Sequence, residues 1–89
     1  MNWDIAFSKQ AEKFLEKNTV SRKDIFELIR SVLKKFQGEK VNIDVKKLKG
    51  EWEGFHRIRK GKTRIIVEVD FDSFSVFVEV IDWRGEVYK

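Results

Sequence analysis

Residues 55–69 read FHRIRKGKTRIIVEV, and this stretch is the most informative part of the chain. Apolar and polar residues alternate on both sides of a Lys-Gly-Lys turn, which predicts two β-strands joined by a tight turn. Side chains two residues apart share one face of a strand, so Arg57 and Arg59 lie on the same face. On the second strand the apolar alternation begins at Ile65, which leaves Arg64 on the opposite face. The sequence therefore predicts three guanidinium groups on one face of a sheet.

This arginine arrangement points to an anionic partner. Guanidinium groups gathered on one face repel each other unless an anion lies among them, and a phosphate backbone is the obvious candidate. Residues 46–64 carry eight Lys/Arg against two Glu, whereas residues 1–45 have a net charge of +2 and residues 65–89 one of −4. Such a basic block inside a folded segment is typical of nucleic-acid binding. The alternative interpretation is a solvated, Lys-rich surface of the kind that heat-adapted proteins carry.

The composition excludes several kinds of site. The chain has 89 residues, no cysteine and a single histidine, His56, so disulfides, thiolate metal sites and multi-histidine sites are impossible. We expect no metal and no cofactor, and we interpret His56 as structural because it points away from Arg57. The N-terminus lacks the pattern of a signal peptide, and no apolar run approaches the length of a membrane span. We expect one cytoplasmic domain over residues 1–89.

The first half of the chain predicts one strand followed by two helices. Residues 3–7 alternate between apolar and polar, as a short strand does. Ser8 can then cap a helix, which breaks at Asn18. Ser21 can cap a second helix, whose apolar residues recur at i, i+3, i+4 and i+7 until it ends at Gly38. The two helices are expected to form an antiparallel hairpin.

The second half predicts three strands, at residues 54–60, 63–70 and 74–82. Residues 39–53 form a polar connection, in which a short apolar alternation is compatible with a brief extended piece. The order β-α-α-β-β-β predicts an α+β fold, with the helix hairpin packed on one face of a mainly antiparallel sheet. The face that carries the arginines is left for a partner.

Five segments, in their order and spacing, resemble the RelE/ParE superfamily, the toxins of bacterial and archaeal toxin–antitoxin pairs. They cover nearly the whole chain and read IAFSKQA at residues 5–11, KLKG at 47–50, FHRIR at 55–59, RIIVEV at 64–69 and RGEVY at 84–88. The resemblance implies a RelE-like fold. For the RelE branch it also implies metal-independent cleavage of mRNA in the ribosomal A site, by attack of a nucleotide 2′-hydroxyl on the adjacent phosphate.

The resemblance also assigns residues. It implies catalytic roles for Arg59, Arg64, Arg84 and Tyr88, and RNA or ribosome binding by Arg57, Lys47, Lys49, Lys60 and Lys62. Well-placed guanidiniums stabilise a developing phosphorane, by about 3–4 kcal/mol for one good donor. A tyrosine with the ordinary pKa of about 10 is a poor base, but neighbouring arginines favour its phenolate. The alternative is that Tyr88 packs as a lid and Arg84 is solvated. Glu68 and Glu79 are expected to hold the guanidiniums in place or to act as a substitute base.

Three other functions stay open at this point. ParE-type toxins share the fold but inhibit DNA gyrase, and they tend to lack the combination of Arg64, Arg84 and Tyr88. A basic RNA-binding or ribosome-binding module without activity would need the arginines but not Tyr88. A degenerate toxin would only bind its antitoxin. The partner that the resemblance implies is a small, acidic, partly disordered antitoxin with helical segments, which an apolar groove beside the helices and the basic block would accept.

Overall fold

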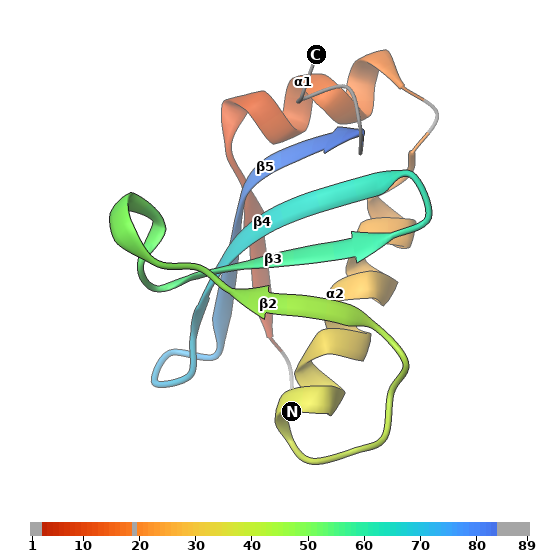
Figure 1. Cartoon of the computed structure of the whole chain (residues 1–89). Helices are drawn as coiled ribbons and strands as arrows, with labels where there is room; N and C mark the ends of the chain where they lie inside the picture. Colours follow the sequence, from red (N-terminus) through yellow and green to blue (C-terminus); the bar gives the residue numbers. More distant parts are fainter. Residues whose placement is uncertain (1–2, 19, 84–89) are drawn as a thin grey trace.

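Two helices and a five-stranded sheet make up the described part of the chain, residues 3–18 and 20–83 of a computed structural model (Figure 1). No helix in this part is long and apolar enough to cross a membrane. In chain order the elements are β1 (Asp4–Phe7), α1 (Lys9–Lys17), α2 (Arg22–Phe36), β2 (Asp44–Lys47), a 3₁₀ turn (Gly50–Trp52), β3 (Phe55–Lys60), β4 (Thr63–Asp70) and β5 (Ser75–Trp83).

Both helices begin where their capping residues predict. The Ser8 hydroxyl accepts the N–H of Ala11 at 3.1 Å, and the Ser21 hydroxyl accepts that of Asp24 at the same distance. Each hydroxyl satisfies a backbone donor that the first helical turn leaves without a partner. After α2, Gly38 adopts a φ of +93°, which glycine reaches without steric cost and which turns the chain out of the helix.

The strands follow the order β1-β5-β4-β3-β2, and all neighbours are antiparallel except the parallel pair of β1 and β5. The three predicted C-terminal strands are confirmed to within one residue. The predicted fold is thus confirmed, with β2 as an additional edge strand. Sequence pattern could not establish β2, because three of its four residues are charged and its extended form depends on hydrogen bonds to β3.

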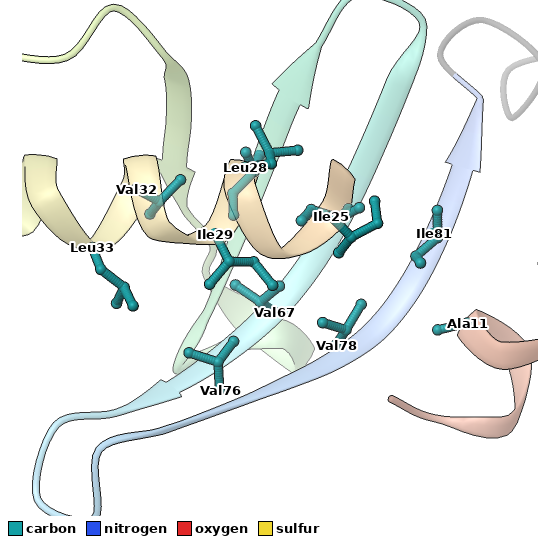
Figure 2. Close-up of a cluster of buried hydrophobic side chains, with 12 residues drawn as sticks. Ala11, Ile25, Leu28, Ile29, Val32, Leu33, Val67, Val76, Val78 and Ile81 are labelled. Carbon is teal, nitrogen blue, oxygen red and sulfur yellow. The ribbon is translucent and has the colours of Figure 1, made fainter. Parts of the chain in front are cut away.

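The core lies between α2 and one face of the sheet. Figure 1 shows α2 running across the back of the sheet, and Figure 2 shows the buried side chains that meet there. The strands contribute β-branched residues that are at most 1% exposed, and the helices contribute Ala11 and one stripe of α2. The strand residues are Ile58, Ile65, Val67, Val76, Val78 and Ile81. Since Arg57, Arg59 and Arg64 alternate with these residues, they occupy the other face, which we call the arginine face.

His56 lies on the helix-covered face, as its position in the alternation predicts. It stands opposite Val67 in the β3–β4 register, and its ring lies 5.0 Å from that of Phe36. Its Nδ1 is buried without a hydrogen-bond partner. Burial, and then the positive charge of Lys47, lower the pKa of His56 below its ordinary value. The structure therefore places this histidine in a packing environment, away from the arginines.

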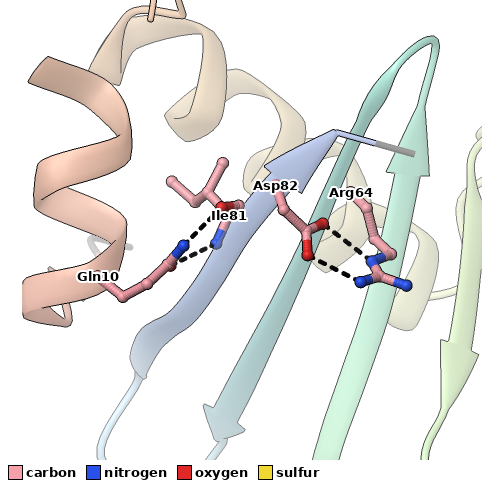
Figure 3. A network of polar contacts seen from close by, with 4 residues as sticks. All are labelled: Gln10, Arg64, Ile81 and Asp82. Carbon is pink, nitrogen blue, oxygen red and sulfur yellow. Dashed lines mark hydrogen bonds and ion pairs between the residues drawn. The ribbon is translucent and has the colours of Figure 1, made fainter. Parts of the chain in front are cut away.

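Helix α1 takes over the edge of β5 where β1 stops. The β1–β5 ladder ends at the pair Phe7 and Val78. Beyond it, the Ser8 hydroxyl donates to the carbonyl of Glu79 at 2.6 Å. The Gln10 side-chain amide then donates to the Ile81 carbonyl and accepts the Ile81 N–H, both at 3.0 Å (Figure 3). A glutamine side chain thus continues the ladder and anchors the end of β5 to the first turn of α1.

Candidate functional site

Four charged side chains form a row across the arginine face, one from each of four neighbouring strands. In register, Asp44 of β2 lies opposite Arg59 of β3, Arg59 opposite Arg64 of β4, and Arg64 opposite Asp82 of β5. Directly opposed residues share a sheet face and lie close together. We call this set the charged row: two arginines in the middle, with an aspartate at each end.

Asp82 holds Arg64 in a two-point ion pair. The Arg64 Nε donates to Oδ1 of Asp82 at 3.0 Å, and its Nη2 donates to Oδ2 at 2.8 Å (Figure 3). Arg64 is 9% exposed, and it is the one charged residue in the buried class among the described residues. Parallel bonds from a planar guanidinium to a carboxylate fix its orientation as well as its position. Arg64 is therefore an oriented group, with part of its charge neutralised.

A β-bulge brings Asp82 to this position. Between the β4–β5 turn and the pair of Val67 and Val78, the two strands keep one register. If that register continued, Ile81 would stand opposite Arg64. The register shifts by one residue between Ile66 and Val67, so that Asp82 stands there instead. A single extra residue in one strand exchanges the two faces beyond it. The bulge therefore directs Ile81 into the core and Asp82 onto the arginine face.

The expectation that Glu68 and Glu79 hold the guanidiniums was wrong, whereas their alternative role as a substitute base stays a prediction. The structure pairs the arginines with Asp82 and Asp44, whereas Glu68 and Glu79 were expected to hold them. Glu79 falls at the bulge, where the simple alternation of faces ends. One sequence signal could have identified Asp82. Ile81 is out of step with Val76 and Val78, so it joins their apolar face only if the strand contains a bulge, and the bulge turns the next residue, Asp82, to the other face.

Arg57 and Arg59 occupy the same face with different partners. Arg57 Nη2 lies 3.4 Å from Oδ1 of Asp44, a long contact to an exposed carboxylate. Arg59 makes no ion pair with any described residue. The Nε atoms of both arginines are buried without a hydrogen-bond partner. A buried donor without an acceptor is unfavourable, and so is a pair of like charges at opposed positions such as Arg59 and Arg64. The repulsion between Arg59 and Arg64 falls if an anion binds over β3.

The predicted lysines do not all gather with the arginines. Lys47 stands opposite His56 and Lys60 follows Ile58 by two residues, so both belong to the helix-covered side of their strands. Lys60 accordingly lines a pocket with Asp24 and Leu28 of α2. They therefore lie on the opposite face from Arg57, Arg59 and Arg64, and their proposed contact with RNA or the ribosome stays a prediction.

Lys46, which was not among the predicted binding residues, stands opposite Arg57 on the arginine face. Lys49 and Lys62 are exposed in the connections that precede and follow β3. Arg84 and Tyr88 lie outside the described residues, and their roles stay predictions. Over residues 3–18 and 20–83, no three histidine or carboxylate side chains are grouped so that they could hold a metal ion.

Several solved structures with a similar fold are complexes of a toxin with its antitoxin. The RelE–RelB complex of Pyrococcus horikoshii contains a chain that is 24% identical, with a TM-score of 0.64, over 97% of this chain and 99% of that one. The RelB–RelE complex of Methanococcus jannaschii gives 27% identity and a TM-score of 0.58, over 93% and 94%. A conserved hypothetical protein of Helicobacter pylori, HP0892, gives 17% and 0.71, over 97% and 99%.

The sequence matches no family model and no curated protein. The structural matches nevertheless extend over almost the full length of both chains, and several of them are RelE-type toxins. The resemblance to the RelE/ParE toxin superfamily is thereby confirmed, and the chain has the fold of a RelE-type toxin.

Proposed function

We propose that the chain is the toxin of a type II toxin–antitoxin pair, and that it cleaves mRNA on the ribosome with its arginine face. The observation that carries this proposal is the charged row: two opposed arginines at the centre of one sheet face in a RelE-type fold. Such a pair does not stabilise the fold, because like charges at opposed positions of a sheet repel each other. A phosphodiester supplies the negative charge that would offset the repulsion.

The proposed chemistry is attack of a 2′-hydroxyl on the adjacent phosphate, which forms a 2′,3′-cyclic phosphate and expels the 5′-oxygen of the next nucleotide. The attacking hydroxyl loses a proton, the phosphorane gains negative charge and the leaving oxygen gains a proton. Arg59 and Arg64 would stabilise the phosphorane, since fixed donors are most effective where charge develops. Tyr88 is the proposed proton acceptor, and Arg84 a second arginine at the phosphate.

The surrounding cations suit an RNA that runs along the sheet. Lys46 and Arg57 lie side by side on β2 and β3, next to the charged row, and Lys62 is exposed in the turn after β3. Such groups bind phosphates without reading the sequence. Codon choice would then come from the ribosome, which presents one stretch of mRNA.

An antitoxin is the proposed second partner. The chains of RelE type in P. horikoshii and M. jannaschii were solved with a RelB antitoxin. Here the basic residues 46–64 favour an acidic partner segment. By covering the arginine face, such a segment would block RNA and relieve the repulsion within the charged row.

Primer extension on a defined mRNA in programmed ribosomes tests the proposal. Wild-type protein should cut only in the A site, and Arg59→Ala should lower the rate by about 100-fold, as loss of one transition-state donor does. Arg30→Ala is the matched control, because Arg30 is exposed on α2, which covers the other side of the sheet. We expect its rate to equal that of the wild type.

The same assay separates the alternatives. Cuts that survive Tyr88→Phe would keep the nuclease and discard Tyr88 as the base. An absence of cuts, together with growth arrest and inhibited DNA supercoiling, would replace the proposal with a ParE-type activity. An absence of cuts with intact ribosome binding would indicate a binding module.

A further inference from the structure

We propose that Asp82 is a positioning residue: it orients the Arg64 guanidinium for the bound phosphate and moderates the positive charge of the row. This inference rests on the proposed nuclease function. It assigns the role to a side chain from β5 that does not itself touch the substrate.

The geometry separates Asp82 from an ordinary surface partner. Its two oxygens receive Nε and Nη2 of Arg64 at 3.0 and 2.8 Å, and the two side chains are 23% and 10% exposed. Exposed ion pairs between mobile side chains contribute little and adopt many geometries. A two-point pair at this depth permits one orientation of the guanidinium plane. Arg64 is thus set before a substrate arrives, which is what an electrostatic catalyst requires.

The carboxylate is itself held from two directions. The β-bulge between Ile66 and Val67 places Asp82 opposite Arg64. The residue before it, Ile81, is buried in the core and bonded through both its N–H and its carbonyl to Gln10 of α1. The backbone that carries Asp82 is therefore anchored by the core and by α1 (Figure 3). A positioning group needs such a second layer of support.

Stability alone does not account for the pair. Two charges removed from water lose hydration, and their attraction repays this loss only in part, so that an apolar pair of similar volume is often as stable or more so. Here Arg64 also stands opposite Arg59. The pair of Asp82 and Arg64 is therefore better explained by the orientation that it gives to the Arg64 guanidinium.

The inference makes opposite predictions for binding and for reaction. Asp82→Asn removes one negative charge beside the row and keeps the shape of the side chain, so RNA should bind as tightly or more tightly. The neutral amide offers only one acceptor oxygen, so the guanidinium loses its two-point support and the chemical step should slow. A merely structural residue would weaken binding and reaction together.

The experiment is single-turnover cleavage of mRNA in programmed ribosomes at increasing toxin concentration. For Asp82→Asn we expect the rate at saturation to fall by about 10- to 100-fold, as misplacement of a catalytic group does, and the half-saturating concentration to stay equal or fall. Asp72→Asn is the control, because it makes the same charge change in the exposed turn between β4 and β5. It should leave the saturating rate unchanged.

Two further measurements keep the result interpretable. The Nε–H signal of Arg64 in a ¹⁵N–¹H spectrum, identified by its loss in Arg64→Lys, should be sharp in the wild type and broadened or shifted in Asp82→Asn. If Asp82→Asn does not fold, Asp82→Glu keeps the charge but moves the carboxylate by one methylene. That variant should slow the saturating rate about tenfold with the half-saturating concentration unchanged.

A saturating rate equal to that of the wild type, in a folded variant, would overturn the inference and leave the proposed function standing. An equal loss in rate and in half-saturation would also overturn it, in favour of a structural role. A wild type that makes no cuts would reject the proposed function, and the inference with it.

Discussion

The two faces of the sheet are built from the same strands, but one face buries apolar side chains and the other gathers positive charge. On the helix-covered face, Ile58, Ile65 and Ile81 are fully buried in the core. On the arginine face, the neighbouring positions hold Arg57, Arg59 and Arg64. The Nε atoms of Arg57 and Arg59 are buried there without a hydrogen-bond partner. Burial of apolar surface stabilises the domain, whereas the clustered cations oppose it. A protein of this size has little stability to spare, so apolar burial on the helix-covered face must offset the charge repulsion on the arginine face.

The largest expected effect comes from the covered face. Ile65→Ala removes a fully buried side chain and leaves a cavity, which should lower the free energy of unfolding by about 2–5 kcal/mol. The matched control is Ile66→Ala, one residue along β4 on the arginine face, where the side chain is only half-buried. Urea denaturation followed by circular dichroism measures both. Equal losses for the two variants would contradict the contrast between the faces.

A smaller effect should distinguish the two arginines of the charged row. Arg64→Ala leaves the partly buried carboxylate of Asp82 without its partner, and we expect a loss of about 1–3 kcal/mol in unfolding free energy. Arg59→Ala removes a like charge opposite Arg64 and should leave stability unchanged or raise it. Thermal and urea unfolding of the two variants measure the difference. If Arg59→Ala were the more damaging, the assignment of Asp82 to Arg64 would lose its energetic meaning.

The smallest effect is the pH dependence of the covered face. The pKa of His56 is lowered in the folded protein, so below its ordinary value of about 6.5 the unfolded chain binds more protons than the folded one. Stability from the neutral imidazole is therefore complete above that pH and is lost as pH falls toward the folded pKa. Since His56 is the only histidine, the urea midpoint of the wild type should decline from pH 7 to pH 5 more steeply than that of His56→Leu. Parallel profiles would show that the imidazole is as well solvated in the folded state as in the unfolded one.

Much of the fold could be predicted because its signals are local. The hydroxyls of Ser8 and Ser21 cap helices wherever such a helix begins, and a Lys-Gly-Lys turn between alternating strands forms a hairpin. At β2 the sequence allowed a brief extended piece but did not establish a strand, because its charged residues form one through hydrogen bonds to β3. The hydrogen bonds between Gln10 and Ile81 were not predicted either, because these residues are 71 positions apart in the chain.

In the candidate site, too, some features follow from local sequence pattern and others depend on contacts between distant residues. The shared face of Arg57, Arg59 and Arg64 follows from sequence pattern alone, because the two-residue period of each strand sets these arginines opposite its apolar residues. The carboxylate that pairs with Arg64 depends on the folded sheet, because it comes from a neighbouring strand. That pairing follows from one bulge in β5, which also places Ile81 in the hydrophobic core. Because successive residues of a strand point to opposite faces, a strand that buries Ile81 turns Asp82 toward the arginines.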